Sequence, residues 1–406
     1  MSLAQVAAPA PAAAAAPATD FARELARIDE AIARCRDDAL VAPTDTERVT
    51  TCLDARYRRA LLTGDLAALG RVEPLIARGI ALIPHPGDLH LLRARLAFHL
   101  HRLDDVARIL DEVAPARACA EGQVLRAELD FQQGRYAGAA ARYEAVIAKS
   151  RPWAALAGLA YLHFKMGEPA RADRLYAEAA DELTAKEMRS YAWLELQRGV
   201  LDLAHGRHAE AGAHYARAAR AYSGWWLVDE HMAELLAVEG DRAGAAALYE
   251  RILARVARPE LHQLVGQLHA LMERPGRARS HFVQARAGYR DSVRAGGVHY
   301  FHHLADFYAE AMADGAKAVA WARRDLALRE NFSTQAALAW ALLRDGRSGE
   351  AAEWIERALA SGASDAHLFA QAAAIFRAAH LPDKAAHCQD LSRRINPRLS
   401  RFHVHR

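Results

Sequence analysis

Residues 156–180, LAGLAYLHFKMGEPARADRLYAEAA, decide the fold because they encode two helices that meet at a glycine. Apolar side chains recur at helical spacing, Gly167 interrupts them, and Pro169 begins a second amphipathic run. Small side chains seven residues before and five residues after this hinge, Ala160 and Ala172, let two backbones approach closely. The stretch therefore predicts a helical hairpin that serves as a packing unit.

The same template recurs along most of the chain. The steps between successive hinges are 33 to 40 residues, and the fifth residue after the hinge is alanine in every unit except the first. An aromatic residue stands nine after the hinge in five consecutive units. The positions seven before and five after the hinge are here called the small columns. Seven before the hinge, every unit has alanine or glycine except one, which has Asp306 beside Ala305. The predicted hinges are His101, Gly134, Gly167, Gly206, Gly240, Glu273, Ala313, Gly346 and His380.

A period near 34 residues with two small columns and an aromatic column resembles the tetratricopeptide repeat family, of the bacterial type. The resemblance covers residues 85–397, about nine repeats. It implies an all-α fold, a right-handed superhelical solenoid of antiparallel helix hairpins. The length of 406 residues then measures the number of repeats and not a number of globular domains.

The ends of the chain differ from the repeats. Residues 1–19 are uncharged and rich in Ala and Pro, which predicts a disordered tail. Residues 20–84 predict an N-terminal helical cap, with Asp20 as the cap of its first helix, followed by an atypical hairpin. Residues 398–406 are expected to form a C-terminal tail.

Composition narrows the classes of function. The chain has 53 basic and 50 acidic residues, a net charge of +3, and no concentrated Lys/Arg block, so we expect no nucleic-acid partner. No run of about 18 apolar residues occurs, so no membrane span is expected. The compartment stays open between the cytoplasm and, if a signal peptide was removed, the periplasm, and homo-oligomerisation also stays open.

The four cysteines, Cys35, Cys52, Cys119 and Cys388, show no C-x-x-C pairing. This spacing indicates neither a zinc knuckle nor a disulfide framework. We therefore expect four small, buried apolar side chains.

The resemblance implies that the first helix of each hairpin lines a concave groove that binds a peptide segment or a helix of a partner protein. Aromatic anchors with a few charges suit such a ligand. An alternative interpretation assigns the aromatic residues to packing between repeats. The candidate groove residues are Arg95, Phe98, Glu128, Phe131, Tyr161, Phe164, Lys165, Trp193 and Trp340, and the same columns later give Glu230, Glu234, Gln263 and Gln267.

The stretch HYFHHLADFYAE, residues 299–310, carries the alternative chemistry. On a helix, His299, His302 or His303, Asp306 and Glu310 form a stripe at spacings of three and four residues. Two imidazoles and a carboxylate can bind a divalent transition metal, which would make the protein a metal carrier or a metal-dependent enzyme. A solvated helix face produces the same stripe.

Signatures of common enzyme classes are missing, including G-x-x-x-x-G-K-[ST], G-x-S-x-G and H-E-x-x-H. We therefore expect a non-catalytic scaffold with no cofactor.

Overall fold

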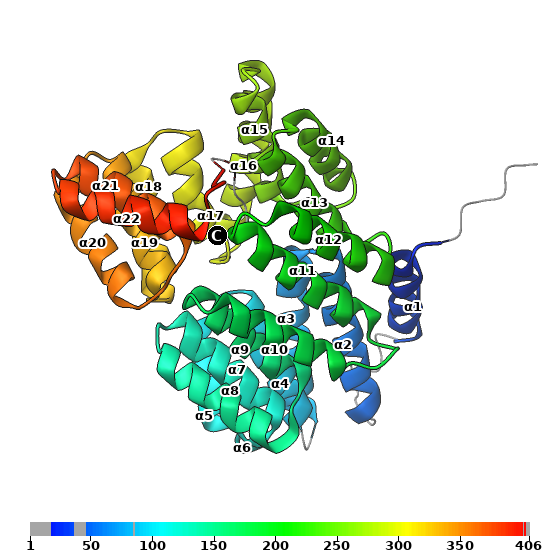
Figure 1. Cartoon of the computed structure of the whole chain (residues 1–406). Coiled ribbons are helices and arrows are strands. Elements are labelled where there is room, and N and C mark those ends of the chain that lie inside the picture. Colours follow the sequence, from blue (N-terminus) through cyan, green and yellow to red (C-terminus); the bar gives the residue numbers. More distant parts are fainter. Residues whose placement is uncertain (1–17, 36–45, 84–85, 401, 403–406) are drawn as a thin grey trace, which may run out of the picture.

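A computed structural model describes residues 18–35, 46–83, 86–400 and 402, and all regular structure within these residues is helical (Figure 1). The predicted tails lie largely outside the described residues. The chain is an all-α solenoid in which helices pair as successive hairpins. The helices are α1 (Asp20–Arg34), α2 (Thr46–Thr63), α3 (Leu66–Leu82), α4 (Gly87–His99), α5 (Leu103–Glu112), α6 (Ala114–Ala118), α7 (Ala120–Gln132), α8 (Tyr136–Ser150), α9 (Trp153–Lys165), α10 (Pro169–Asp181), α11 (Met188–Ala204), α12 (His208–Ala221), α13 (Trp226–Glu239), α14 (Arg242–Leu253), α15 (Pro259–Leu271), α16 (Pro275–Arg294), α17 (Phe301–Asp306), the π-helix η2 (Phe307–Ala311), α18 (Gly315–Leu328), α19 (Phe332–Arg344), α20 (Ser348–Ala360), α21 (Ala366–Ala378) and α22 (Pro382–Ile395).

The hinges lie where the repeat template predicts them. All nine predicted hinge residues have a positive φ, from 49° at Ala313 to 102° at Gly240. At Gly167 the backbone N–H donates to the carbonyl of Phe164, and the next N–H, of Glu168, donates to that of His163. These bonds satisfy helix-terminal carbonyls that have no intrahelical donor. The turn thus ends one helix and allows the next to begin.

The residues of the small columns lie buried where the two helices of a hairpin pack together. Ala160 and Ala172, on α9 and α10, are both completely buried, and so is Tyr176 between the helices. Ala160 packs in one cluster with Tyr176, and Ala172 packs with Phe164 and Leu201. The packing role predicted for these columns is therefore confirmed.

The unit that departs from the small column contains a π-helix. The N–H of Met312 donates to the carbonyl of Phe307, five residues earlier, at 3.0 Å. A π turn inserts one extra residue into a helix. Ala305, eight residues before the hinge Ala313, is consequently the buried small residue, at 3 % exposure, and Asp306 turns into the interior.

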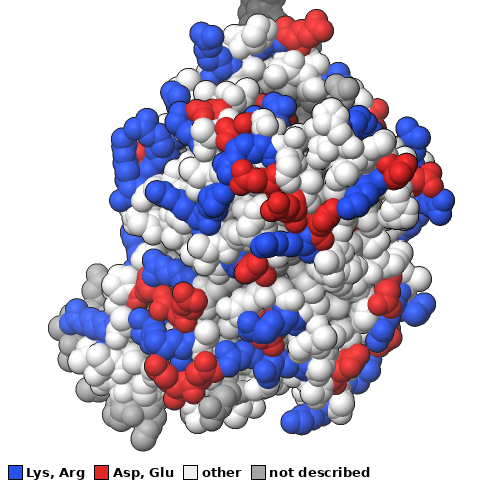
Figure 2. Space-filling view, turned by 90° about the vertical axis from the view of Figure 1, so that its left-hand side faces the viewer, with Lys and Arg blue, Asp and Glu red and all other residues white. Residues whose placement is uncertain are grey.

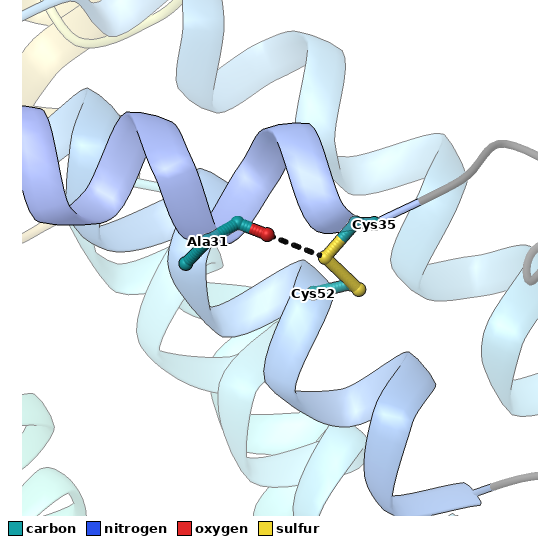
Figure 3. The surroundings of a disulfide bond; sticks show 3 residues. All are labelled: Ala31, Cys35 and Cys52. Carbon is teal, nitrogen blue, oxygen red and sulfur yellow. Dashed lines mark hydrogen bonds between the residues drawn. A yellow bond between two sulfur atoms is a disulfide. The ribbon is translucent and has the colours of Figure 1, made fainter.

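The expectation that Cys35 and Cys52 are buried thiols is wrong, because they form a disulfide bond (Figure 3). The bond joins the C-terminal end of α1 to α2, where the two Cα atoms lie 5.7 Å apart. The sequence separation of 17 residues gave no sign of this proximity, since it arises when the cap helix folds back on α2. Cys119 and Cys388 are free thiols.

The cap helix α1 is held by a distant loop. Thr19, and not the predicted Asp20, is its N-cap, since the Thr19 hydroxyl accepts the N–H of Ala22. Asp20 instead accepts hydrogen bonds from the backbone N–H and the hydroxyl of Ser223 at 3.0 and 2.6 Å. The cap therefore contacts the chain two hundred residues later, between α12 and α13.

A regular ladder of five further hydrogen bonds joins the two superhelical turns. The acceptors are carbonyls two or three residues before a turn with positive φ, at four of the predicted hinges and at Gly64 between α2 and α3. The donors come from the start of a hairpin 164 to 200 residues later, or from the segment after α22. Figure 1 shows the C-terminal end of the described chain near α11 and α12. The five pairs are Trp226 Nε1 with Leu62 O (3.0 Å), His299 Nδ1 with His99 O (3.1 Å), Asn331 Nδ2 with Gln132 O (2.9 Å), Ser364 N with Lys165 O (2.9 Å), and Asn396 Nδ2 with Leu203 O (3.3 Å).

These bonds use helix-terminal carbonyls, which commonly have no intrahelical donor; that of Leu203 also accepts the N–H of Gly206. Donors from the second superhelical turn thereby bond to carbonyl groups along the edge of the first turn. The solenoid is closed at these five points, and its interior is walled by both turns.

Candidate functional site

A cavity of about 500 Å³, here called the interior pocket, lies within the solenoid. Its walls come from the first helices of successive hairpins, α13, α15, α17, α19 and α21, with Lys165 of α9 added from the preceding turn. The lining includes apolar side chains, among them Leu264, Phe332 and Leu368. The repeat thus places one face of each first helix toward a common interior.

An ion pair forms part of the pocket wall. Arg258, which precedes α15, contacts the carboxylate of Glu260. Burial opposes the charge on both groups, but Glu260 offsets it and raises the pKa of Arg258, while Arg258 and His303 lower the pKa of Glu260. The second oxygen of Glu260, Oε2, is buried and accepts no hydrogen bond from any described residue. An ionised oxygen of this kind favours a hydrogen-bond donor beside it.

Histidines crowd the adjoining wall. The rings of His302 and His303 lie 4.0 Å apart, and the ring of His101 from the first turn lies 5.6 Å from that of His302. Burial and then the neighbouring His303 lower the pKa of His302 well below its usual range, and burial also lowers that of His303. The imidazoles are therefore neutral near pH 7. His302 Nδ1 is buried and has no hydrogen-bond partner among the described residues.

The stripe predicted as a metal alternative is engaged in other contacts. His299 lies against the carbonyl of His99, and Asp306 accepts a hydrogen bond from Gln263 at 2.7 Å. Glu310 accepts the indole N–H of Trp340 at 2.6 Å. Within the described residues, the donor atoms of His299, His302, His303 and Asp306 do not form a converging group of three.

Lys165, the predicted groove cation, is almost fully buried. Its ammonium lies 3.9 Å from a carboxylate oxygen of Asp365, at the N-cap of α21, and 4.7 Å from the ring centroid of Phe164. The cation therefore bridges the two turns of the solenoid at the edge of the interior pocket.

The other predicted groove residues fall into separate groups. Phe131, Tyr161 and Phe164 form a chain of edge-to-face contacts at 5.4 and 6.3 Å, as expected for neighbouring first helices. The remaining ones lie elsewhere: Arg95 pairs with Glu121 at 2.8 Å, Phe98 packs beside His99, and Trp193 contacts Trp153 at 6.1 Å.

Glu128 lies on α7 with the groove residues of the first turn. Burial, with the charge of Glu121, raises its pKa to about 7. Its carboxyl is therefore close to half-protonated at neutral pH, unlike that of Glu260 in the interior pocket.

Of the nine predicted groove residues, the interior pocket brings together Lys165 and Trp340. Glu230, Gln263 and Gln267, from the same columns, also line it. Reasoning from sequence missed other lining residues, although two of them occupy the template position thirteen before the hinge, which could have identified them. The missed residues are Arg258, Glu260, Asp365, His367 and Gln371, of which Glu260 and His367 occupy that position.

On the face that Figure 2 shows, basic and acidic side chains are interspersed. No helix in the described ranges is long and apolar enough to cross a membrane.

No known family profile and no curated protein matches this sequence. Among solved structures, the chain is similar to a tetratricopeptide repeat protein from Parabacteroides merdae ATCC 43184, with 16 % identity over 59 % of this chain and 93 % of that one, at a TM-score of 0.39. It is also similar to the Cut9–Hcn1 hetero-tetramer of the APC/C, with 15 % identity over 93 % and 96 % of the chains and a TM-score of 0.36. A third is a monomeric mutant of IFIT1 with Gppp-AAAA, with 14 % identity over 92 % and 97 % and a TM-score of 0.40. The fold assignment rests on the hairpins and hinges of this chain itself.

Proposed function

We propose that this protein is a non-catalytic scaffold whose interior pocket binds a basic segment of a partner protein. The observation that carries the proposal is the charge of the pocket lining. Lys165 and Arg258 supply two positive charges, and the carboxylates supply four negative charges, so the lining has a formal net charge of −2 when histidines are counted as neutral. The four carboxylates belong to Glu230, Glu260, Asp306 and Asp365.

A lysine or arginine side chain would match this lining. It brings donors to the buried Oε2 of Glu260 and can lie over the ring of Trp340, which faces the same pocket. The apolar lining residues suit the methylene stem of such a side chain. A volume of about 500 Å³ holds a short segment and not a folded domain.

The disulfide between Cys35 and Cys52 supports the periplasmic alternative for the compartment, because such bonds persist in oxidising environments. The partner would then be an exported protein.

The test is a positional-scanning library of ten-residue peptides, with binding measured by fluorescence anisotropy. We expect peptides with a central Lys or Arg to bind more tightly than those with Glu or norleucine there. Trp340→Ala should weaken binding of the basic peptides at least tenfold, as for a hot-spot aromatic residue. Trp354→Ala, on the second helix α20, is the matched control and should have no effect. Preference for acidic peptides, or equal loss in both variants, would refute the proposal.

A further inference from the structure

A carboxylate and two imidazoles converge outside the interior pocket. Glu250 on α14, His269 on α15 and His281 on α16 each offer one donor atom, and the three atoms lie within 4.8 Å of one another. His269 Nε2 lies 3.5 Å from Glu250 Oε1. Within the described residues this is the one group of three or more such side chains whose donors converge.

His269 is the unusual member of the group. Its side chain is 2 % exposed, and neither ring nitrogen makes a hydrogen bond with any described residue. Buried polar atoms nearly always have a partner. The ring therefore presents two unsatisfied nitrogens, one of which faces the carboxylate of Glu250.

Two other hairpins have charged or polar groups at the equivalent positions and allow a comparison. Four residues before the hinge stand Asp130 and Asp202, and eight after it stand their partners: Arg142 lies 2.7 Å from Asp130, and His214 lies 3.4 Å from Asp202. In these two hairpins an acid faces a basic group. At the hinge Glu273, both positions are histidines.

A third position, eleven residues before the hinge, also has a histidine in the α15–α16 hairpin where another hairpin has an acid. Eleven residues before the hinge, the α11–α12 hairpin has Glu195, whose carboxylate lies 2.8 Å from His214 Nδ1. The α15–α16 hairpin has His262 there, and its Nδ1 lies 3.1 Å from His281 Nδ1. Three imidazoles, those of His262, His269 and His281, thus replace two carboxylates and one imidazole.

The spacing of the imidazoles suits a metal ion. The 3.1 Å separation of the Nδ1 atoms of His262 and His281 is close to the edge of a tetrahedron with bonds of about 2.0–2.1 Å, which is about 3.3 Å.

We propose that Glu250, His269 and His281, with His262 beside them, bind a divalent transition metal ion of the zinc class. Nitrogen and carboxylate donors are those that zinc prefers. The ion would link hairpin α13–α14 to hairpin α15–α16. The side chain of Glu250 is 48 % exposed, so a coordination position on that side is open to water.

The test uses the full chain purified without an affinity tag, treated with a chelator and titrated with ZnCl₂ by isothermal calorimetry. We expect one equivalent of Zn²⁺ to bind and to raise the melting temperature. His281→Gln and Glu250→Gln should each weaken the affinity at least about tenfold, since losing even an outer-shell partner costs that much. Both side chains are partly exposed, so these variants should fold, as circular dichroism will verify.

The matched control is His387→Gln, an exposed histidine on α22, which should leave the affinity unchanged. No uptake of Zn²⁺ by the wild-type protein would overturn the proposal, because His262 and His281 would then share only a hydrogen bond. Undiminished affinity in His281→Gln and Glu250→Gln would overturn it as well. If binding is lost in a His302→Gln/His303→Gln variant instead, the ion lies in the interior pocket, and the proposal is overturned.

Discussion

Replacing Gly199 with alanine tests how closely the two helices of a hairpin pack. Gly199 lies on α11 in the small column, seven residues before the hinge Gly206. An added Cβ would lie 2.2 Å from Cε1 and 2.6 Å from Cδ1 of Tyr215, whose ring is completely buried. The ring cannot move aside without displacing its neighbours. Overpacking of this kind costs about 1–3 kcal/mol.

Alanine is also a better helix former than glycine, by about 0.8–1.0 kcal/mol. We therefore expect Gly199→Ala to reduce the free energy of unfolding by up to about 2 kcal/mol. Gly70→Ala is the matched control on α3, because nothing lies within 4 Å of the Cβ that it adds. This control should stabilise the protein by about 1 kcal/mol.

The assay is urea denaturation followed by circular dichroism, with amide hydrogen exchange of α11 and α12 to locate the effect. Opposite shifts of the two midpoints are predicted. If both variants shift the midpoint upward by similar amounts, the close approach at Gly199 is absent and the packing argument fails.

Three further predictions follow from single contacts. Cys35→Ser opens the link to Cys52 and should lower the free energy of unfolding by about 3 kcal/mol, the chain-entropy value for a loop of about 15 residues; an unchanged urea midpoint would contradict it. The pKa values of His302 and His303 are lowered in the folded state, so their contribution to stability is complete above pH 6.5 and is lost as the pH falls below it, by about 1.4 kcal/mol per pH unit for each proton excluded; melting temperatures that stay level from pH 7 to 5 would count against this. Tyr161→Ala removes two edge-to-face contacts of about 0.5–1.5 kcal/mol each, whereas Tyr161→Phe keeps the ring and should melt close to the wild type; equal losses in both would show that the ring contacts are not the cause.

The repeat pattern was sufficient to predict the hairpins because it records packing between neighbouring helices. Hinges without glycine, such as Glu273 and His380, were found from spacing alone, and both adopt positive φ. The departure at Asp306 was visible as a break in the small column, and its cause is the π turn of η2.

Contacts between the two turns could not be predicted in this way. The ladder uses an indole, an imidazole, two side-chain amides and one backbone N–H as donors, so the donors form no column of one residue type. Which residues of the first turn lie beside residues up to two hundred positions later depends on the pitch of the superhelix. The repeat period of about 34 residues does not specify that pitch. The burial of Lys165 against Asp365 follows from the same closure.

The disulfide was missed for a related reason. Cys35 and Cys52 lie in the cap, where the repeat columns fail, so no template position indicated that α1 folds back on α2.

Amide hydrogen exchange with and without a bound lysine-containing peptide tests the central claim, that ligands bind in the interior pocket. The account predicts protection on the first helices α13, α15, α17, α19 and α21, with unchanged exchange on the second helices α14, α16, α18 and α20. Protection confined to the second helices would contradict it.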